Sequence, residues 1–276
     1  MHYIRLGSGK PLLLVHGLGG SWHSWRTILD ELALHREVIA VDLPGHGQTP
    51  PLPGEVSIRT LANALTEFLA VNKLMGIDAV GSSMGAHLVL ELARRGGILG
   101  AVVSLDPGGF WRGWEQPFFY RSLYISIRLL RWLKPLLPFM TRHAITRTLF
   151  FAQLSARPWL LSPQLLLDEI HNYLASPSFD ELLYRLGHGQ PQKGAWRGSI
   201  RHRLVIGWGR RDRVCFTRQA ERAMALFPDA RLHWFEHSGH FPHWDVPEQT
   251  LRLILESTGD PASKSHRHTI CDDANG

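Results

Sequence analysis

Residues 79–87, Ala-Val-Gly-Ser-Ser-Met-Gly-Ala-His, decide how the rest of this chain can fold. An apolar strand leads into a turn in which Gly81, Ser83 and Gly85 fit the pattern G-x-S-x-G. Helical spacing of apolar residues begins at Met84. The glycines let the strand and helix backbones pass close to the serine, because they carry no side chain. The stretch therefore predicts a strand, a sharp turn and a helix. The Ser83 hydroxyl would lie at the top of a sheet, with helix N–H groups aimed at it.

Upstream, residues 2–6, 11–15 and 37–42 have the composition of strands, and the second is apolar throughout, as in a strand buried on both faces. A glycine-rich loop then opens a helix predicted at 22–34. We expect this loop to supply an oxyanion hole, with the N–H of Leu18 converging on that of Met84. His16 and Asp42 are interpreted as structural, because a ring nitrogen or a carboxylate can hold its own loop through backbone hydrogen bonds.

Downstream, the sequence predicts a helix at 58–72 with Ser57 as its N-cap, and a strand at 99–105 that ends in Asp106. Strand and helix alternation stops from about residue 110 to 200, where proline-broken helical segments are expected. It resumes with a strand at 203–208, a helix at 216–226, a strand at 231–235 and a helix at 246–256. The fold class is α/β, a mostly parallel sheet flanked by helices with an inserted helical cap. The expected divisions are a core of 1–109 and 201–256, a cap of 110–200 and a polar, disordered tail of 257–276.

The composition of the chain bears on its domain size, its partners and its cellular setting. The chain has 276 residues and 44% hydrophobic residues, enough for one large α/β domain. The net charge of +6 is scattered and accompanies no nucleic-acid-binding motif, so we expect no nucleic-acid partner. Cys215 and Cys271 lie far apart, which favours a reducing, cytoplasmic setting. No signal peptide or transmembrane run is visible, and oligomeric state cannot be predicted.

Ser83, Asp212 and His240 each follow the end of a predicted strand, in that order along the chain. Ligands bind at this edge of open parallel sheets, so the three side chains can meet there. The resulting arrangement resembles the α/β-hydrolase fold superfamily over residues 1–256. The motifs that carry the resemblance are His16-Gly17, Asp42–Gly47, Gly81–Gly85, Gly209–Asp212, and Gly239-His240 followed by Pro247-Glu248.

The resemblance implies a catalytic triad. His240 would take the proton of the Ser83 hydroxyl, and Asp212 would orient the imidazole ring. Asp106 is an alternative acid, because some relatives take the acid from that strand end. No cofactor is implied. The spacing of His237, His240 and His243 suggests a metal, but no carboxylate or cysteine cluster accompanies them, so no metal site is predicted.

The cap of this family shapes the substrate pocket. Its many aromatic residues favour an apolar small molecule, and we expect Trp22, Trp111 and Trp244 to line the pocket. Residues 108–200 hold 11 Lys or Arg against 5 Asp or Glu. This excess suggests weak contact with a membrane surface, the alternative being a cap helix with one solvated face.

The expected function is a serine hydrolase that cleaves a carboxylic ester or thioester with an apolar acyl or aromatic part, through an acyl-enzyme. Two alternatives stay open. One is a C–C bond hydrolase of aromatic ring-fission products. The other is a ligand receptor on the same fold, which would bind without turnover.

Overall fold

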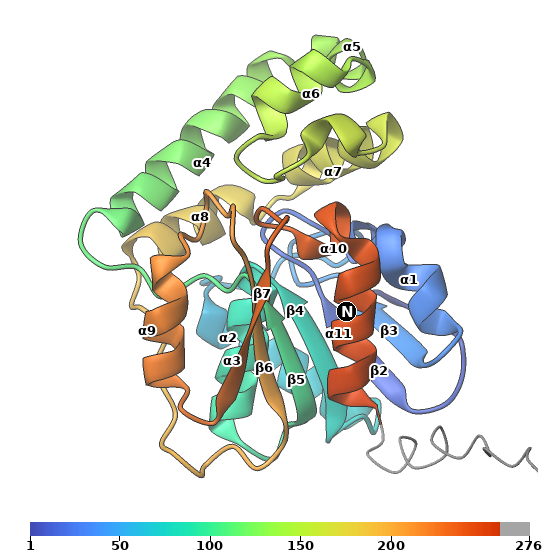
Figure 1. Ribbon diagram of the computed structural model, residues 1–276, viewed down its shortest axis with the longest axis vertical. Helices are drawn as coiled ribbons and strands as arrows, with labels where there is room; N and C mark the ends of the chain where they lie inside the picture. Colours follow the sequence, from blue (N-terminus) through green and yellow to red (C-terminus); the bar gives the residue numbers. More distant parts are fainter. Residues whose placement is uncertain (260–276) are drawn as a thin grey trace, which may run out of the picture.

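The computed structural model describes residues 1–259 and contains one seven-stranded sheet in the order β1-β3-β2-β4-β5-β6-β7 (Figure 1). Only the pairing of β1 with β3 is antiparallel, so the predicted mostly parallel sheet is confirmed. The strands are β1 Tyr3–Leu6, β2 Pro11–Val15, β3 Glu37–Val41, β4 Ile77–Ser82, β5 Leu99–Leu105, β6 Leu204–Gly209 and β7 Ala230–Phe235.

The strand order reverses between β2 and β4. These two strands are paired in parallel, with Val15 opposite Gly81 at their carboxyl ends. The loop after β2 and the turn after β4 are therefore neighbours. This is the position at which open parallel sheets bind their ligands.

Helices cover both faces of the sheet, which explains why β2 is apolar at every position. Leu12 and Leu14 belong to a core cluster on the side of α1 (Arg26–Ala33) and α11 (Pro247–Thr258). Leu13 and Val15 belong to the cluster on the opposite side. The helices of that second side are α2 Ile58–Val71, α3 Met84–Arg95 and α9 Arg218–Leu226.

Several predicted helices appear close to their expected bounds. Helix α2 begins after Ser57, whose side chain accepts a hydrogen bond from the Thr60 N–H, as the N-cap prediction requires. The helix expected at 22–34 is divided into a 3₁₀ turn, η1 (Trp22–Trp25), and α1. Helix α11 runs two residues past its expected end at 256. The rest of the tail that was predicted at 257–276 lies, from residue 260 on, outside the residues that the structure describes.

Between β5 and β6 the chain forms helices and no strand among the described residues, and these helices lie across one end of the sheet (Figure 1). We call residues 110–200 the cap. The cap helices are α4 Glu115–Trp132, η2 Lys134–Leu136, α5 Leu137–Arg142, α6 Ala144–Phe151, η3 Pro158–Leu160, α7 Pro163–Ala175 and α8 Phe179–His188. Two of its helices, η3 and α7, start at a proline, and η2 has one at its second position; proline is favoured in a first turn because it has no N–H to leave unpaired. No helix within residues 1–259 is long and apolar enough to cross a membrane.

Candidate active site

Ser83 lies on a strained turn between β4 and α3. Its φ of 55° is in the left-handed region, which is rare for a residue with a side chain. Neighbouring glycines make the turn possible: a Cβ at Gly85 would collide with the carbonyl oxygens of Val15 and His16, and a Cβ at Gly81 with the Gly85 carbonyl. The strain places the Ser83 hydroxyl at the sheet edge rather than inside the helix.

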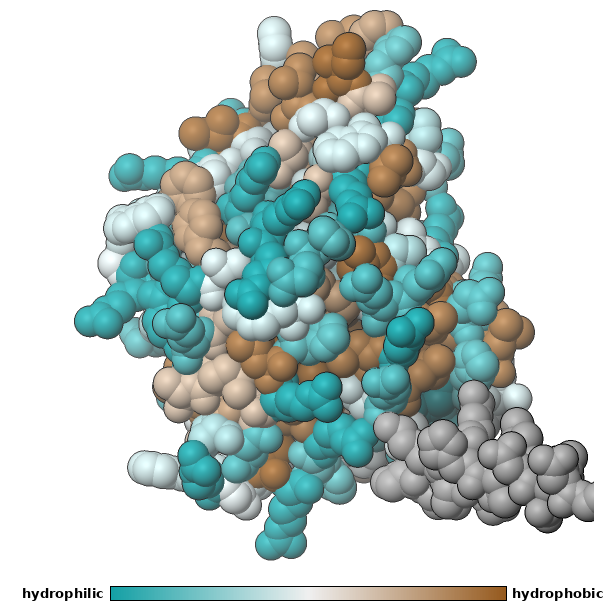
Figure 2. Space-filling model, in the orientation of Figure 1, coloured by the Kyte–Doolittle hydropathy of each residue, from teal (hydrophilic) through white to brown (hydrophobic). Residues whose placement is uncertain are grey.

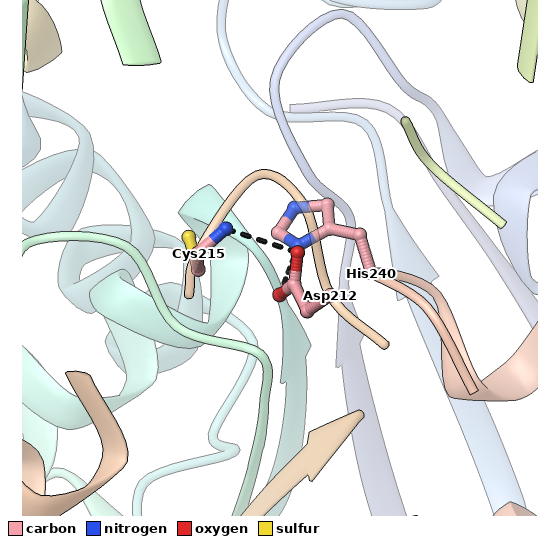
Figure 3. A group of neighbouring side chains, drawn as sticks. All are labelled: Asp212, Cys215 and His240. Atoms are coloured by element: carbon pink, nitrogen blue, oxygen red, sulfur yellow. Dashed lines mark hydrogen bonds and ion pairs between the residues drawn. The ribbon is translucent and has the colours of Figure 1, made fainter. Parts of the chain in front are cut away.

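The structure brings Ser83, His240 and Asp212 together. Nε2 of His240 is 2.8 Å from the Ser83 Oγ, and Nδ1 of His240 is 2.8 Å from Oδ2 of Asp212. Asp212 is itself fixed, because its Oδ1 accepts hydrogen bonds from the N–H groups of Val214 and Cys215. Figure 3 shows the bond from Cys215. With the proton on Nδ1, the histidine donates to the carboxylate and its Nε2 can accept the serine proton.

Asp106, the alternative acid, is also buried at this edge, after β5. Its Oδ1 accepts a hydrogen bond from the Gly209 N–H, and no hydrogen bond joins it to His240 among the described residues. Burial, together with the neighbouring Asp212 carboxylate, raises the pKa of Asp106 well above its usual value. The geometry therefore favours Asp212 as the partner of the histidine.

Leu18 and Met84 line the same cavity as Ser83. Neither N–H donates to a backbone carbonyl in the described residues, so both remain available to a ligand. His16 holds the Leu18 loop as predicted: its Nδ1 is 2.7 Å from the Gly17 carbonyl, and its Nε2 accepts from the Leu43 N–H. Burial lowers the pKa of His16, which keeps the ring neutral.

Asp42 also has the predicted structural role. Its carboxylate accepts hydrogen bonds from the N–H groups of Trp22 and Gln48 and pairs with His2. It thereby joins the loop after β3 to the start of η1.

A cavity of about 880 Å³, including its open mouth, lies over Ser83 and His240. On the cap side, its wall includes the inner face of α4, the end of α6 and the residues that follow α6. Its lining is mainly apolar, and among the described residues the only side chain in it that can carry a positive charge is His240. The polar members besides Ser83 and His240 are Ser126, Gln153 and Tyr173.

Only one of the three tryptophans expected in this pocket lies there. Trp111 is on the cavity wall. Trp22 instead stacks on His23, with ring centroids 3.7 Å apart. Trp244 donates from its indole nitrogen to the Ser24 carbonyl and borders only a small void behind the Leu18 loop. The expectation for Trp22 and Trp244 was wrong, because the Trp22 ring packs on His23 within η1 and the Trp244 ring is hydrogen-bonded to the Ser24 backbone of η1.

Two buried carboxylates near the site were missed from the sequence. Glu169 of α7 accepts a hydrogen bond from the Ser24 hydroxyl, and burial raises its pKa to about 7. Asp245 accepts from the hydroxyl of Ser155 and from the N–H groups of Ala156 and Gly239. Glu169 connects the cap to η1. Asp245 connects the cap to the loop that carries His240. Their partners are distant in sequence, so no local pattern signals either role.

His237, His240 and His243 do not form a group of potential metal ligands within residues 1–259. The one group of potential ligands found among the described residues is Asp212, Cys215 and His240 (Figure 3). Its donor set fits a metal poorly. Asp212 and His240 are hydrogen-bonded to each other, and burial and the adjacent carboxylate raise the pKa of the Cys215 thiol well above its usual value. His243 is buried elsewhere, against the Trp25 ring.

Comparisons with known proteins identify relatives of this chain. The sequence matches the family model described as "Alpha/beta hydrolase family" over residues 12–253. It is 28% identical over 269 residues to the 2-hydroxy-6-oxo-2,4-heptadienoate hydrolase of Pseudomonas putida, covering 90% of this chain and 89% of that protein. The fold is similar to that of a thermophilic esterase from Thermogutta terrifontis (TM-score 0.71, 19% identity, 92% and 91% of the two chains). It is also similar to that of a meta-cleavage product hydrolase from Pseudomonas fluorescens (TM-score 0.68, 18% identity, 92% of each chain).

Proposed function

The chain belongs to the alpha/beta hydrolase family, and within that family we propose that it is a serine hydrolase of apolar carboxylic esters or thioesters. The observation that carries the proposal is the unbroken series of contacts from Ser83 through His240 to Asp212, at 2.8 Å each. A serine hydroxyl is a weak nucleophile at neutral pH, and a histidine in this position provides the base that it lacks.

In the proposed mechanism, Nε2 of His240 accepts the Ser83 proton as Oγ attacks the carbonyl carbon of the substrate. Asp212 keeps the imidazole in the required tautomer and stabilises the imidazolium. The N–H groups of Leu18 and Met84 bind the oxyanion. His240 then protonates the leaving alcohol or thiol, and an acyl group remains on Ser83. Water, activated by His240, releases the acid and restores the serine.

The cavity lining supports an apolar acyl or aromatic group. Phe119, Leu123 and Ile127 lie on its α4 side, and the burial of a hydrocarbon chain there is favourable by about 0.8 kcal/mol per methylene. Without an arginine or lysine in the wall, a substrate with an ionised carboxylate would lose its hydration and gain no partner. The cavity therefore favours a neutral ester over a substrate with an ionised carboxylate.

A second candidate is hydrolysis of a C–C bond. The relative from Pseudomonas putida that is similar over most of the chain is named a 2-hydroxy-6-oxo-2,4-heptadienoate hydrolase. The same serine, histidine and acid would serve both reactions. That named substrate is an acid, however, and the absence of a cation from the described cavity wall argues for the ester.

The test is turnover of p-nitrophenyl esters of increasing chain length by the wild type and by Ser83→Ala. We expect kcat/KM to rise with chain length, and the variant to lose turnover while keeping the wild-type unfolding temperature. An aromatic ring-fission product should be cleaved far more slowly. Faster cleavage of that compound than of any ester would establish the second candidate. Binding of ligands without any Ser83-dependent turnover would indicate a receptor and would refute both.

A further inference from the structure

The cap carries a long stretch of one-sided charge. Residues 116–167 contain seven Arg or Lys residues and no Asp or Glu. Two of the seven are engaged within the protein: Arg147 is buried and donates to backbone carbonyls, and Arg131 pairs with Asp180. Four others are exposed and form no ion pair within residues 1–259, namely Arg121, Arg128, Lys134 and Arg142.

Large apolar side chains are exposed among these cations. Trp132 and Ile145 are each 77% exposed, and Leu149 is 74% exposed. Figure 2 shows hydrophobic side chains gathered over the end of the molecule where α5 and α6 lie in Figure 1. We call the four exposed cations and the following six apolar residues the crown: Ile125, Trp132, Leu136, Phe139, Ile145 and Leu149.

Helical spacing explains how α4 contributes to the crown and to the cavity at once. Residues three, four and seven positions apart share one face of a helix. The outward stripe of α4 alternates in chemistry: Arg121, Ile125, Arg128 and Trp132. The opposite side forms the cavity wall: Phe119, Leu123, Ile127 and Leu130. A single helix therefore separates the crown from the cavity over Ser83.

We propose that the crown docks on the surface of an anionic lipid bilayer. Cationic side chains interleaved with tryptophan and aliphatic residues are the composition of helices that lie in a membrane interface. Arginines would bind lipid phosphates, while the apolar side chains would enter the boundary between headgroups and acyl chains. Isolated exposed apolar residues are common on soluble proteins, but a group of them gathered over one end of the molecule, as in Figure 2, is typical of an interaction site.

Charge argues against a second copy of this chain as the occupant. A two-fold contact would place the crown against itself, so its four cations would face four cations with no acidic residue to neutralise them. Nucleic acid would pair with the arginines but would leave the exposed isoleucine and leucine side chains without an apolar partner. An anionic bilayer offers phosphates to the cations of the crown and an apolar boundary to its hydrophobic side chains.

The experiment is co-sedimentation of the full chain with vesicles of phosphatidylcholine containing about one-third phosphatidylglycerol, and with vesicles of phosphatidylcholine alone. We expect binding that requires phosphatidylglycerol and weakens as ionic strength rises. The variant Arg121→Gln/Arg128→Gln should bind about 25-fold more weakly, at roughly five-fold per cation near the surface. Trp132→Ser should also weaken binding.

The chain offers matched controls at the opposite end of the sheet, on the segment that runs from the last cap helix, α8, to β6. Trp196 is 89% exposed, and Arg197 and Arg201 are exposed near it. Trp196→Ser and Arg197→Gln/Arg201→Gln should bind vesicles like the wild type. All variants change exposed side chains, and their unfolding temperatures, measured in parallel, should match that of the wild type.

Three results would overturn the proposal. The first is equal sedimentation with both vesicle compositions, and the second is equal loss of binding in the crown and control variants. The third is a concentration-dependent dimer, detected by light scattering, that Trp132→Ser abolishes without any vesicle binding. Because binding is measured without substrate, failure here leaves the proposed hydrolase activity standing, and inactivity of the enzyme leaves vesicle binding unaffected.

Discussion

Replacement of Glu169 by glutamine tests whether this buried carboxyl joins the cap to η1 in its neutral form. Its side chain is 1% exposed, and its Oε2 is 3.0 Å from the Ser24 Oγ. The charged and titratable groups that face it are Arg26, Asp168 and Tyr173. Burial dominates, and it raises the pKa of Glu169 from 4.5 to about 7.

The raised pKa sets the direction of the pH dependence. Below about pH 4.5 the carboxyl is protonated in both the folded and the unfolded protein. Between about pH 4.5 and 7 the unfolded chain releases the proton while the folded protein retains it, so the free energy of unfolding falls. At about 1.36 kcal/mol per pH unit, the loss from about pH 5 to pH 8 is about 2.5 kcal/mol. Glutamine keeps the shape and cannot ionise, so Glu169→Gln lacks this loss.

The assay is urea unfolding of the wild type and Glu169→Gln, followed by circular dichroism from about pH 5 to pH 8. The stability of the variant minus that of the wild type should increase by about 2.5 kcal/mol across the range. Glu67→Gln, at an exposed position on α2, is the control and should show no such trend. A difference for Glu169→Gln that is constant with pH would refute the assignment of a neutral, buried carboxyl.

Three further predictions concern the site itself. Asp212→Asn should lower kcat for ester turnover by about 10⁴-fold without changing the unfolding temperature, whereas Asp106→Asn should keep most of the activity. The reverse order would assign the role of the acid to Asp106. Gly85→Ala should destabilise the protein by at least about 2 kcal/mol in urea unfolding, because the new Cβ meets the carbonyl oxygens of Val15 and His16. A variant as stable as the wild type would contradict this close approach. Asp245→Asn should lower kcat by more than it changes KM, because the loop that carries His240 loses a carboxylate acceptor. An unchanged kcat would show that this loop does not depend on the hydrogen bonds to Asp245.

Much of the core could be predicted because its signals are local. Strand β2 is a continuous apolar run, and Ser57 marks the start of α2 by its own side chain. The positions of Ser83, Asp212 and His240 followed from topology, since the carboxyl ends of parallel strands share one edge. The sequence alone therefore predicts that these three residues, far apart along the chain, lie together.

The remainder depended on contacts that no local pattern records. The side to which Trp22 and Trp244 turn is decided by the packing around η1, and aromatic composition alone cannot specify it. Glu169 is paired with a hydroxyl 145 positions away, and Asp245 with one 90 positions away. The four-residue helix α10 (Pro242–Asp245) is too short to show a period.

Covalent labelling of Ser83 tests the central claim most directly. A fluorophosphonate reacts with a serine whose proton is removed by a neighbouring base and whose oxyanion is stabilised. Intact mass and peptide mapping should show one adduct per chain on the peptide that contains Ser83. Labelling should stop in Ser83→Ala and become much slower in His240→Ala. An active enzyme that stays unlabelled at Ser83, or a His240→Ala variant labelled at the wild-type rate, would contradict the proposed mechanism.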